Sequence, residues 1–477
     1  MPYHSGKIRI LPLLIACLIL PSCVSNVGYY TKVNNLVSAG DTAGALSTVD
    51  SSKESVYGEK NALLYHLDRG FLLHISSGYA ESTADFDSVK RLYDDYFTKS
   101  ITTEASTLLI NDNMRPYYGE DYERALVNVF SAINYIMLGR DNDALVEARQ
   151  ADHFLTTLQV NYGYKDAYKE DAFVRYLMGM IYENQGEIND AYISYRQALD
   201  AYKYYEKNYG VATPQKLVSD ALRTAKMLGF SSEIAEIKKN WPAAAAAGTS
   251  SPADGNTGEL VILDYNGLSP EKVDTFFEIS FGEGWAYVEG MKVEGDDRAK
   301  VDQARALVRS IAAEEQVRIA FPKFVPLGYA IGGALAETED GRLYPGETVE
   351  DIGAIAVKGL DDRIARIRIR AIARGIIKFA LTKEISRKVE QSSGELSGWL
   401  TQKVLTAAAT ATELSDKRSW RTLPDKIIML RVPLTAGQHS VTLKYYDRNN
   451  QTIFTETLNN ITIKPGKKSF FLVRTAR

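Results

Sequence analysis

Two segments of this chain share one spacing of small residues and tyrosines, and that spacing restricts how the N-terminal half can fold. The clearer segment carries Gly179, Tyr182, Gly186, Ala191, Tyr195 and Ala198, and the other carries Ala132, Tyr135, Gly139, Ala144, Ala148 and Ala151. A glycine or alanine at a helix crossing lets two antiparallel helices approach closely, and the following tyrosine fills the groove beside it. The next glycine ends the first helix. Each segment therefore predicts a helical hairpin.

The spacing is that of a tetratricopeptide repeat, although the two segments lie 47 residues apart rather than the usual 34. We attribute the excess to a loop or helix extension at 162–164. From Tyr29 to Trp241 apolar residues recur at every third or fourth position, which predicts helices throughout. Stacked hairpins need about three units to bury a continuous face. We therefore expect hairpins from Tyr29 to about Phe130 as well, although the matches near Gly40 and Gly70 are looser.

A stretch of small and polar residues follows the helical half and indicates a linker. Residues 242–258 hold five consecutive alanines and then a Gly/Ser/Thr-rich run, a composition that buries little surface. Beyond it, alternating apolar residues predict strands, as at Leu260 and Ile262, and two helical stretches lie between the strands. The expected fold class is α+β. The expected order is a signal at 1–22, a helical repeat domain at 23–241, a linker at 242–258, a mixed α/β domain at 259–420, and an antiparallel β-strand region at 421–477 packed with it.

The N-terminus predicts where the chain resides. Lys7 and Arg9 precede an apolar run from Ile10 to Leu20, which is too short to span a bilayer and is typical of a secretory signal peptide. The junction Leu20-Pro21-Ser22-Cys23 is that of a bacterial lipoprotein. Cleavage before Cys23 leaves its thiol and amine for acylation, and two or three acyl chains anchor firmly. By resemblance to enterobacterial lipoproteins, in which aspartate after the cysteine favours the inner membrane, Val24 favours the outer membrane, with the protein facing the periplasm.

Composition excludes several classes of function. The formal net charge is −4, and loss of Lys7 and Arg9 with the signal makes it −6, which disfavours nucleic acid as a partner. Cys17 leaves with the signal and Cys23 is acylated, so no disulfide or thiolate metal site is expected. The histidines lack metal-binding spacing, and no nucleophile elbow, P-loop or dinucleotide fingerprint occurs. We expect no metal, no cofactor, no catalytic residue and no enzyme activity.

Tyrosines are unusually dense between residues 162 and 209, which suggests a contact surface for a partner. The residues that we predict to make this contact are Tyr164, Tyr168, Tyr176 and Tyr202. Tyrosine offers rigid contact area with a polar tip, which suits a peptide or glycan groove. The alternative is internal packing of the helical hairpins, a role that the repeat spacing already gives to Tyr182 and Tyr195.

Two further groups of residues carry a weaker functional alternative. The basic stretch from Arg363 to Lys383 would suit anionic headgroups or phosphate, but it also suits the solvated side of a core-facing helix. The carboxylates Glu278, Glu283 and Glu289 lie near Trp285 and Tyr287. Two of these carboxylates beside a sugar-stacking ring would suit acid/base work on a glycan. Solvated surface is the simpler interpretation of this group.

Three blocks of sequence carry a family resemblance. They are Tyr122-Glu123-Arg124 through Ala144-Leu145-Val146-Glu147-Ala148-Arg149, Gly258-Glu259-Leu260-Val261, and Arg418-Ser419-Trp420-Arg421-Thr422-Leu423-Pro424. In these blocks the chain resembles an uncharacterised family of bacterial lipoproteins with tetratricopeptide-like repeats. The resemblance implies an envelope lipoprotein with a helical N-terminal half and a mixed C-terminal half. Some members are encoded near lipoproteins that activate peptidoglycan synthases, and no catalytic residue is attributed to the family.

These observations lead to one functional hypothesis and two alternatives. The hypothesis is a lipid-anchored periplasmic scaffold or adaptor whose helical groove binds an envelope protein. The C-terminal sheet either docks on the helical array or makes a second contact. The alternatives are an envelope enzyme acting on glycan or peptide, and a structural subunit of a larger envelope assembly.

Overall fold

The helical half is a stack of hairpins in the computed structural model. The model describes residues 27–103, 112–162, 171–246, 256–291, 296–393 and 414–477. The successive hairpins are α2 (Val27–Ser38) with α3 (Thr42–Ser51), α4 (Ala62–Ile75) with α5 (Tyr79–Thr103), α6 (Asp121–Met137) with α7 (Asp141–Tyr162), α8 (Ala172–Gln185) with α9 (Ile188–Tyr209), and α10 (Gln215–Leu228) with α11 (Ser231–Asn240). Each helix packs on the next. The expectation of hairpins between Tyr29 and Phe130 is confirmed.

One packing rule recurs in three hairpins and explains the sequence spacing. A Cβ added at Gly179 in α8 would lie 2.3 Å from Cε1 of Tyr195 in α9, so this tyrosine ring rests directly on the glycine backbone. Gly70 meets the ring of Phe86 in the same way in α4 and α5, with 2.7 Å to its Cε1. The third pair, Ala132 and Ala148, is fully buried at the same spacing of 16 residues. In the first two pairs a large ring fills the space beside a glycine, whereas the third pair consists of two buried alanines.

Glycine also ends the first helix of both predicted repeats. Gly139 and Gly186 follow α6 and α8 with φ of 72° and 84°, a conformation that costs a residue with a Cβ about 1 kcal/mol or more. The amide N–H groups of these glycines close the helix ends, because Gly186 donates to the carbonyl of Glu183 at 3.0 Å. The prediction that both glycines terminate helices is confirmed.

The described residues of the C-terminal half form three small sheets. Sheet A has the order β10-β1-β7-β6, the ribbon pairs β2 with β3, and sheet C has the order β5-β4-β8-β9. Their strands are β1 (Thr257–Asn266), β2 (Glu271–Ser280), β3 (Gln316–Val325), β4 (Gly333–Thr338), β5 (Leu343–Pro345), β6 (Glu347–Asp351), β7 (Lys426–Thr435), β8 (Gly437–Tyr446), β9 (Thr452–Ile463) and β10 (Lys468–Thr475). Within sheet A, β1 runs parallel to β10 and antiparallel to β7. The fold class is α+β, as expected.

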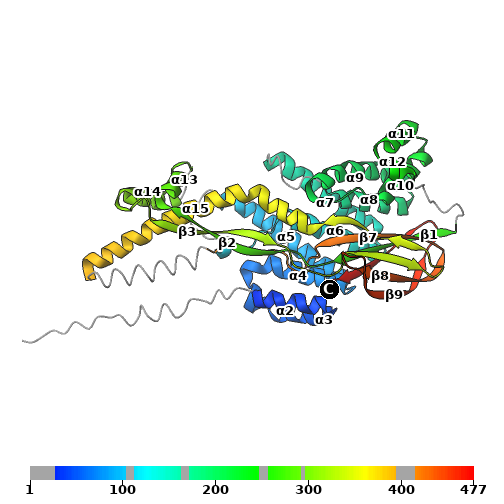
Figure 1. The fold of residues 1–477 in the computed structure, drawn as a ribbon, viewed down its shortest axis with the longest axis horizontal. Helices are drawn as coiled ribbons and strands as arrows, with labels where there is room; N and C mark the ends of the chain where they lie inside the picture. Colours follow the sequence, from blue (N-terminus) through cyan, green and yellow to red (C-terminus); the bar gives the residue numbers. More distant parts are fainter. Residues whose placement is uncertain (1–26, 104–111, 163–170, 247–255, 292–295, 394–413) are drawn as a thin grey trace, which may run out of the picture.

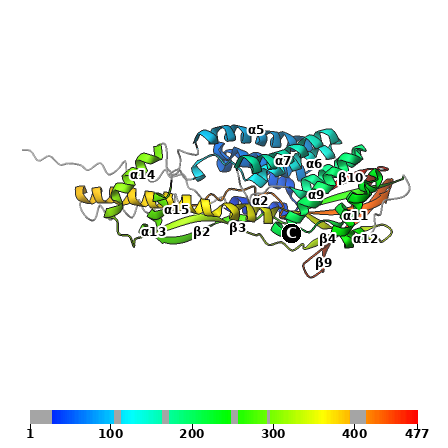
Figure 2. The same cartoon turned by 90° about the horizontal axis from the view of Figure 1, so that it is seen from above.

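Sheet A is the middle layer of the body, between the helical array and sheet C. Val261, Leu263 and Tyr265 of β1 belong to the core shared with the helices. Leu260 and Ile262 point the other way, into the core shared with sheet C. Figure 2 shows the array lying along one side of the sheets. The alternation of apolar and polar residues at Leu260 and Ile262 is typical of a strand with one buried face, but β1 is buried on both faces because helices cover one and a second sheet covers the other.

A long arm projects from this body. The ribbon of β2 and β3 packs against α15 (Ile352–Ser393), and α13 (Phe281–Glu289) and α14 (Asp296–Leu307) cover its far end. The arm has its own apolar core, in which Phe281, Trp285 and Ile376 are buried. A Cβ at Gly284 would lie 2.3 Å from Cδ1 of Ile376, so α13 lies very close to α15.

The expected domain boundaries can be compared with the observed helices and strands. In the expected linker, 242–258, α12 (Pro242–Ala246) is a short helix, β1 begins at Thr257, and 247–255 lie outside the described residues. Sheets A and C each combine strands from 259–420 with strands from 421–477, so these two regions fold together. The expected signal and Cys23 also lie outside the described residues. No helix among the described residues is long and apolar enough to cross a membrane.

Candidate functional site: the interface between the helical array and the sheets

Most of the helices that face sheet A are the first members of the hairpins, and the chain's own C-terminal half covers them. Contacts to the sheet come from α4, α6 and α8, and also from α9 through Tyr202 and from α10 through Asp220. The segment before β7 continues this cover, because Trp420 is fully buried against Phe71, Phe86 and Phe130 of the array. The face that the sequence predicted to receive a partner is therefore occupied within the chain itself.

The backbone of the segment 414–424 is held by polar side chains of the array. The amide of Asn113 donates to the carbonyls of Leu414 and Ser415, both at 3.0 Å. The N–H of Trp420 donates to Oε1 of Glu123 at 2.7 Å. The hydroxyl of Thr422 donates to Asp68 at 2.9 Å. The array thus holds this segment through hydrogen bonds to its backbone and to the Thr422 side chain, and both partners belong to the same chain.

Two buried carboxylates anchor this segment, and burial changes their titration. Asp68 also accepts from the phenols of Tyr30 at 3.0 Å and Tyr57 at 2.8 Å. Burial raises the pKa of Asp68 to about 6, although these hydrogen bonds act in the opposite direction. Burial raises the pKa of Glu123 to about 7, and the nearby charge of Glu120 adds to the increase. Both groups sit inside the joint between array and sheet.

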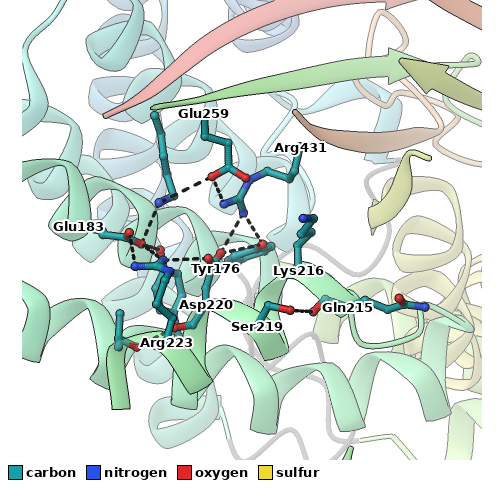
Figure 3. A network of polar contacts seen from close by, with 12 residues as sticks. Tyr176, Glu183, Gln215, Lys216, Ser219, Asp220, Arg223, Glu259 and Arg431 are labelled. Carbon is teal, nitrogen blue, oxygen red and sulfur yellow. Dashed lines mark hydrogen bonds and ion pairs between the residues drawn. The ribbon is translucent and has the colours of Figure 1, made fainter. Parts of the chain in front are cut away.

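A buried ion network joins α8 and α10 to sheet A (Figure 3). Arg431 of β7 donates to Asp220 of α10 at 3.0 Å and to the phenol of Tyr176 at 2.6 Å, and it also pairs with Glu259 of β1. Burial alone would raise the pKa of Asp220, but Arg431 and other nearby cations lower it below its ordinary value. The carboxylate of Asp220 therefore stays ionised at neutral pH.

The same network includes two further cations, Arg223 and Lys468. Arg223 binds Glu183 at 2.7 Å and Asp220 at 2.9 Å, while Lys468 of β10 binds Glu183 at 2.8 Å. Three cations thus face three carboxylates, all of them buried or half-buried. Because the charges balance, the network has no surplus charge to attract an ionic ligand. The network therefore has a structural role, because it links the helical array to the C-terminal half of the chain.

Two further polar links complete the joint. His74 of α4 binds Asn134 of α6 at 2.6 Å and the phenol of Tyr265 in β1 at 2.8 Å, and all three residues are fully buried. Burial lowers the pKa of His74 to about 4, so the ring is neutral at pH 7. At the base of the arm, Glu120 pairs with both Lys272 of β2 and Arg363 of α15.

The predicted contact tyrosines fall into two groups. Tyr164 and Tyr168 lie outside the described residues. Tyr176 and Tyr202 are fully buried, and their phenols serve the intramolecular joint. Tyr176 accepts from Arg431, and Tyr202 donates to the carbonyl of Val349 at 2.9 Å. These two rings follow the alternative of internal packing and are not exposed to a partner in this structure.

The basic stretch of α15 and the carboxylates of the arm have structural contacts. Arg363 pairs with Glu120, the guanidinium of Arg368 lies 4.4 Å from the ring centre of Phe321, and Lys383 pairs with Glu315 at 2.6 Å. The stretch therefore fixes the arm.

Among the three candidate acids of the arm, Glu283 accepts from Ser280 at 2.8 Å at the start of α13. Glu289 accepts from Nε1 of Trp285 at 3.0 Å, and Glu278 lies opposite Arg318 in the ribbon. The Trp285 ring is 5% exposed and cannot offer a face to a sugar. Among the described residues, no three His, Cys, Asp or Glu side chains are grouped so as to hold a metal ion.

Sequence reasoning missed the residues that build the joint. Arg431 and Lys468 were not singled out because each looked like an ordinary polar position within a strand. Two signals were available. Arg431 sits within an apolar run, and Trp420 lies in a segment without helical or strand periodicity. A charged residue or a tryptophan in such a place indicates a buried partner elsewhere in the chain.

Comparison with known proteins gives similarity to solved structures alone. No protein-family model and no curated protein matches the chain. The chain is similar to MamA with 12% identity, 45% of this chain and 94% of that chain covered, and a TM-score of 0.28. It is similar to a kinesin light chain with TPR-like repeats from Podosopora anserina with 10% identity, coverage of 46% and 95%, and a TM-score of 0.31. It is also similar to PilW, a type IV pilus biogenesis factor, with 14% identity, coverage of 46% and 93%, and a TM-score of 0.23.

The hairpins themselves define the class of the N-terminal half. Successive antiparallel helix pairs, a small residue opposite a large ring 16 positions later, and glycine at the helix ends are the features of a tetratricopeptide-like repeat array. The chain joins such an array to a strand-containing C-terminal half.

Proposed function

We propose that this protein is a lipid-anchored scaffold or adaptor on the periplasmic side of the bacterial outer membrane, where it binds an envelope protein. The N-terminal sequence supports the location, because a basic start, a short apolar run and Cys23 follow one another as in a lipoprotein signal. Two or three acyl chains on Cys23 would hold the folded body at the membrane surface.

The main support for the scaffold role is the buried ion network that fixes the array to sheet A. Arg431, Asp220 and Glu259 are buried together across this joint, so breaking it would expose unpaired charges. The body is therefore expected to present fixed surfaces rather than to open around a substrate. A rigid body with a projecting arm suits the positioning of other proteins.

The partner is expected on the outward surfaces, because the inner face of the array is occupied. Several apolar side chains of the array are exposed there: Leu138, Val146, Ile193 and Met227. Exposed apolar side chains of this size are available to a protein partner at modest desolvation cost. Capture of the bound protein directly from cells would identify this partner.

The location is tested by metabolic labelling with palmitate. The full chain should incorporate label, and Cys23→Ser should abolish incorporation while leaving the synthesis of the protein intact. In fractionated membranes Val24→Asp should move the protein toward the inner membrane. Label that persists in the Cys23→Ser variant would overturn the proposed anchor.

The scaffold role is tested by crosslinking in intact cells, followed by purification and mass spectrometry. Ile193→Glu together with Met227→Glu should reduce recovery of a specific partner at least severalfold without changing the melting temperature. Leu343→Glu in β5, which is 54% exposed and lies outside the array, is the matched control. Equal recovery from all variants would contradict binding through the array. A large particle made of this chain in detergent extracts would instead favour the structural-subunit alternative.

A further inference from the structure

Strand β9 lies at an open edge of sheet C. The order β5-β4-β8-β9 places it last, and β8 is its only partner among the described strands. At such an edge every second residue directs its backbone N–H and C=O away from the sheet. These groups form a row that an added strand can pair with.

Three other strand edges are short or contacted by another part of the chain. The far edge of sheet C is β5, which has three residues and ends in Pro345. On the outer side of β10, the side chain of Asn184 replaces a neighbouring strand. Its Oδ1 accepts from the N–H of Lys468 at 2.7 Å, and its Nδ2 donates to the Lys468 carbonyl at 3.0 Å. The β2 edge is contacted by the segment before β7, because Asp274 accepts from the N–H of Ser415 at 2.9 Å.

The β9 edge is held in a strand conformation before any partner arrives. The ring of Phe454 stacks on Tyr445 of β8 with centroids 4.4 Å apart, and the guanidinium of Arg477 lies 4.7 Å from the centre of the Phe454 ring. The hydroxyls of Thr442 and Thr457 lie 3.2 Å apart across the strands. Binding of a partner strand would therefore cost little conformational entropy on the β9 side, because this edge is already ordered.

The regular part of the edge is short and almost uncharged. Regular pairing with β8 runs from Phe454 to Leu458, because the register shifts between Thr452 and Phe454 and again beyond Leu458, where Asn460 has a φ of 59°. The stretch Thr452–Leu458 contains no proline, lysine or arginine, and Glu456 is its one charged residue. Lysine and proline are two of the residues by which proteins commonly block strand edges, and this stretch contains neither.

We propose that residues 452–458 dock an extended segment of the partner protein as a fifth strand of sheet C, with a lysine or arginine opposite Glu456. Glu456 is exposed, and opposite charges across neighbouring strands attract. A second copy of this chain is the poorer occupant. Because the stretch contains no cation, pairing it with itself leaves Glu456 without a counter-ion. This inference rests on the proposed scaffold function and names the chemistry of its partner.

The test uses the full chain in detergent and a fluorescent peptide as the probe. The probe is acetyl-Thr-Val-Lys-Val-Thr-Val-Thr-amide, and two matched peptides replace its lysine by glutamate or by proline. We expect saturable binding of the lysine peptide and slower amide hydrogen exchange within 452–458. Glu456→Lys should weaken binding by about three- to tenfold, and the glutamate peptide should recover it. Glu236→Lys, at an exposed helix position, should change nothing.

Any of three results would overturn the docking site. The first is equal binding of the proline and lysine peptides, and the second is slower amide hydrogen exchange that maps outside β9. The third is slow exchange of the 452–458 amides in a dimer of this chain without peptide. Palmitate labelling is independent of this experiment. Its failure alone would remove the membrane anchor and leave the edge site intact, whereas failed peptide binding with normal labelling would remove only the edge site.

Discussion

The backbone N–H of Trp420 donates to Oε1 of Glu123 across a separation of 297 residues, with a distance of 2.7 Å, and both side chains are fully buried. Through this contact the C-terminal half becomes part of the core of the helical array. The array is therefore expected to lose stability when the C-terminal segment loses its contacts, rather than to behave as an independent domain.

Glu123→Ala tests this dependence. Glu123 also accepts from the phenol of Tyr117 at 2.7 Å and from the N–H of Glu120 at 3.0 Å, so removal of the carboxylate leaves buried donors without an acceptor. We expect the free energy of unfolding to fall by about 3 kcal/mol in urea titrations. Glu236→Ala, on an exposed helix face, should stay within about 0.5 kcal/mol of the parent. Equal stability of the two variants would contradict a shared core.

Arg431→Met tests the ion network of Figure 3. The methionine retains much of the arginine's volume but leaves Asp220 and Glu259 buried without this cation. Breaking a buried ion pair from one side typically costs about 3 to 5 kcal/mol. Calorimetry should therefore show a clear drop in melting temperature. The control is Lys203→Met, whose exposed pair with Asp200 is worth at most about 1 kcal/mol.

Gly179→Ala tests the packing of glycine against tyrosine in the array. The new methyl group would lie 2.3 Å from Cε1 of Tyr195, so the hairpin must open or the buried ring must move. We expect a loss of about 1 to 3 kcal/mol in chemical denaturation. Gly359→Ala in α15 is the matched control, because no heavy atom lies within 4 Å of its added Cβ. That change should be neutral or stabilise the helix by up to about 1 kcal/mol.

Stability is expected to rise as the pH falls from about 8 to about 5. Burial raises the pKa of Asp264 to about 7, of Glu123 to about 7 and of Asp68 to about 6, so the folded state holds these protons more tightly than the unfolded chain. Such groups favour the folded state below their unfolded pKa, and this contribution disappears as the pH rises through the folded pKa. His74 opposes this rise below about pH 6.5, because burial lowers its pKa to about 4, but it is one group against three. Below about pH 4 the trend should reverse, since the pKa of Asp220 is lowered by its cations.

Asp264→Asn isolates one of these acids. Oδ1 of Asp264 accepts from Thr475 at 2.6 Å, whereas Oδ2 has no hydrogen-bond partner among the described residues. The neutral amide keeps the first contact and removes the buried charge. We expect the variant to be about 1 to 2 kcal/mol more stable than the parent at pH 8, with the difference vanishing near pH 5. A variant that is less stable at both pH values would contradict the raised pKa.

The helical hairpins were predictable from the sequence because their determinants are local. The spacing of Gly179 and Tyr195 sets a contact within one hairpin, and Gly186 ends a helix through its own backbone conformation. Strand positions were predictable for the same reason, since alternation is visible over a few residues. The predicted contact of Tyr176 and Tyr202 with a partner could not be derived in this way. The spacing shows that tyrosines recur along the helices, but it does not show which other element covers them.

The sequence by itself determined which segments are helices or strands and where the helices of the array end, because periodicity and glycine act over one or two turns. Only the tertiary structure decided that β1 lies between β10 and β7, that Trp420 enters the array, and that Arg431 finds Asp220. These contacts join residues more than 150 positions apart. Their choice depends on which faces remain uncovered when all elements pack together, and no local pattern encodes it.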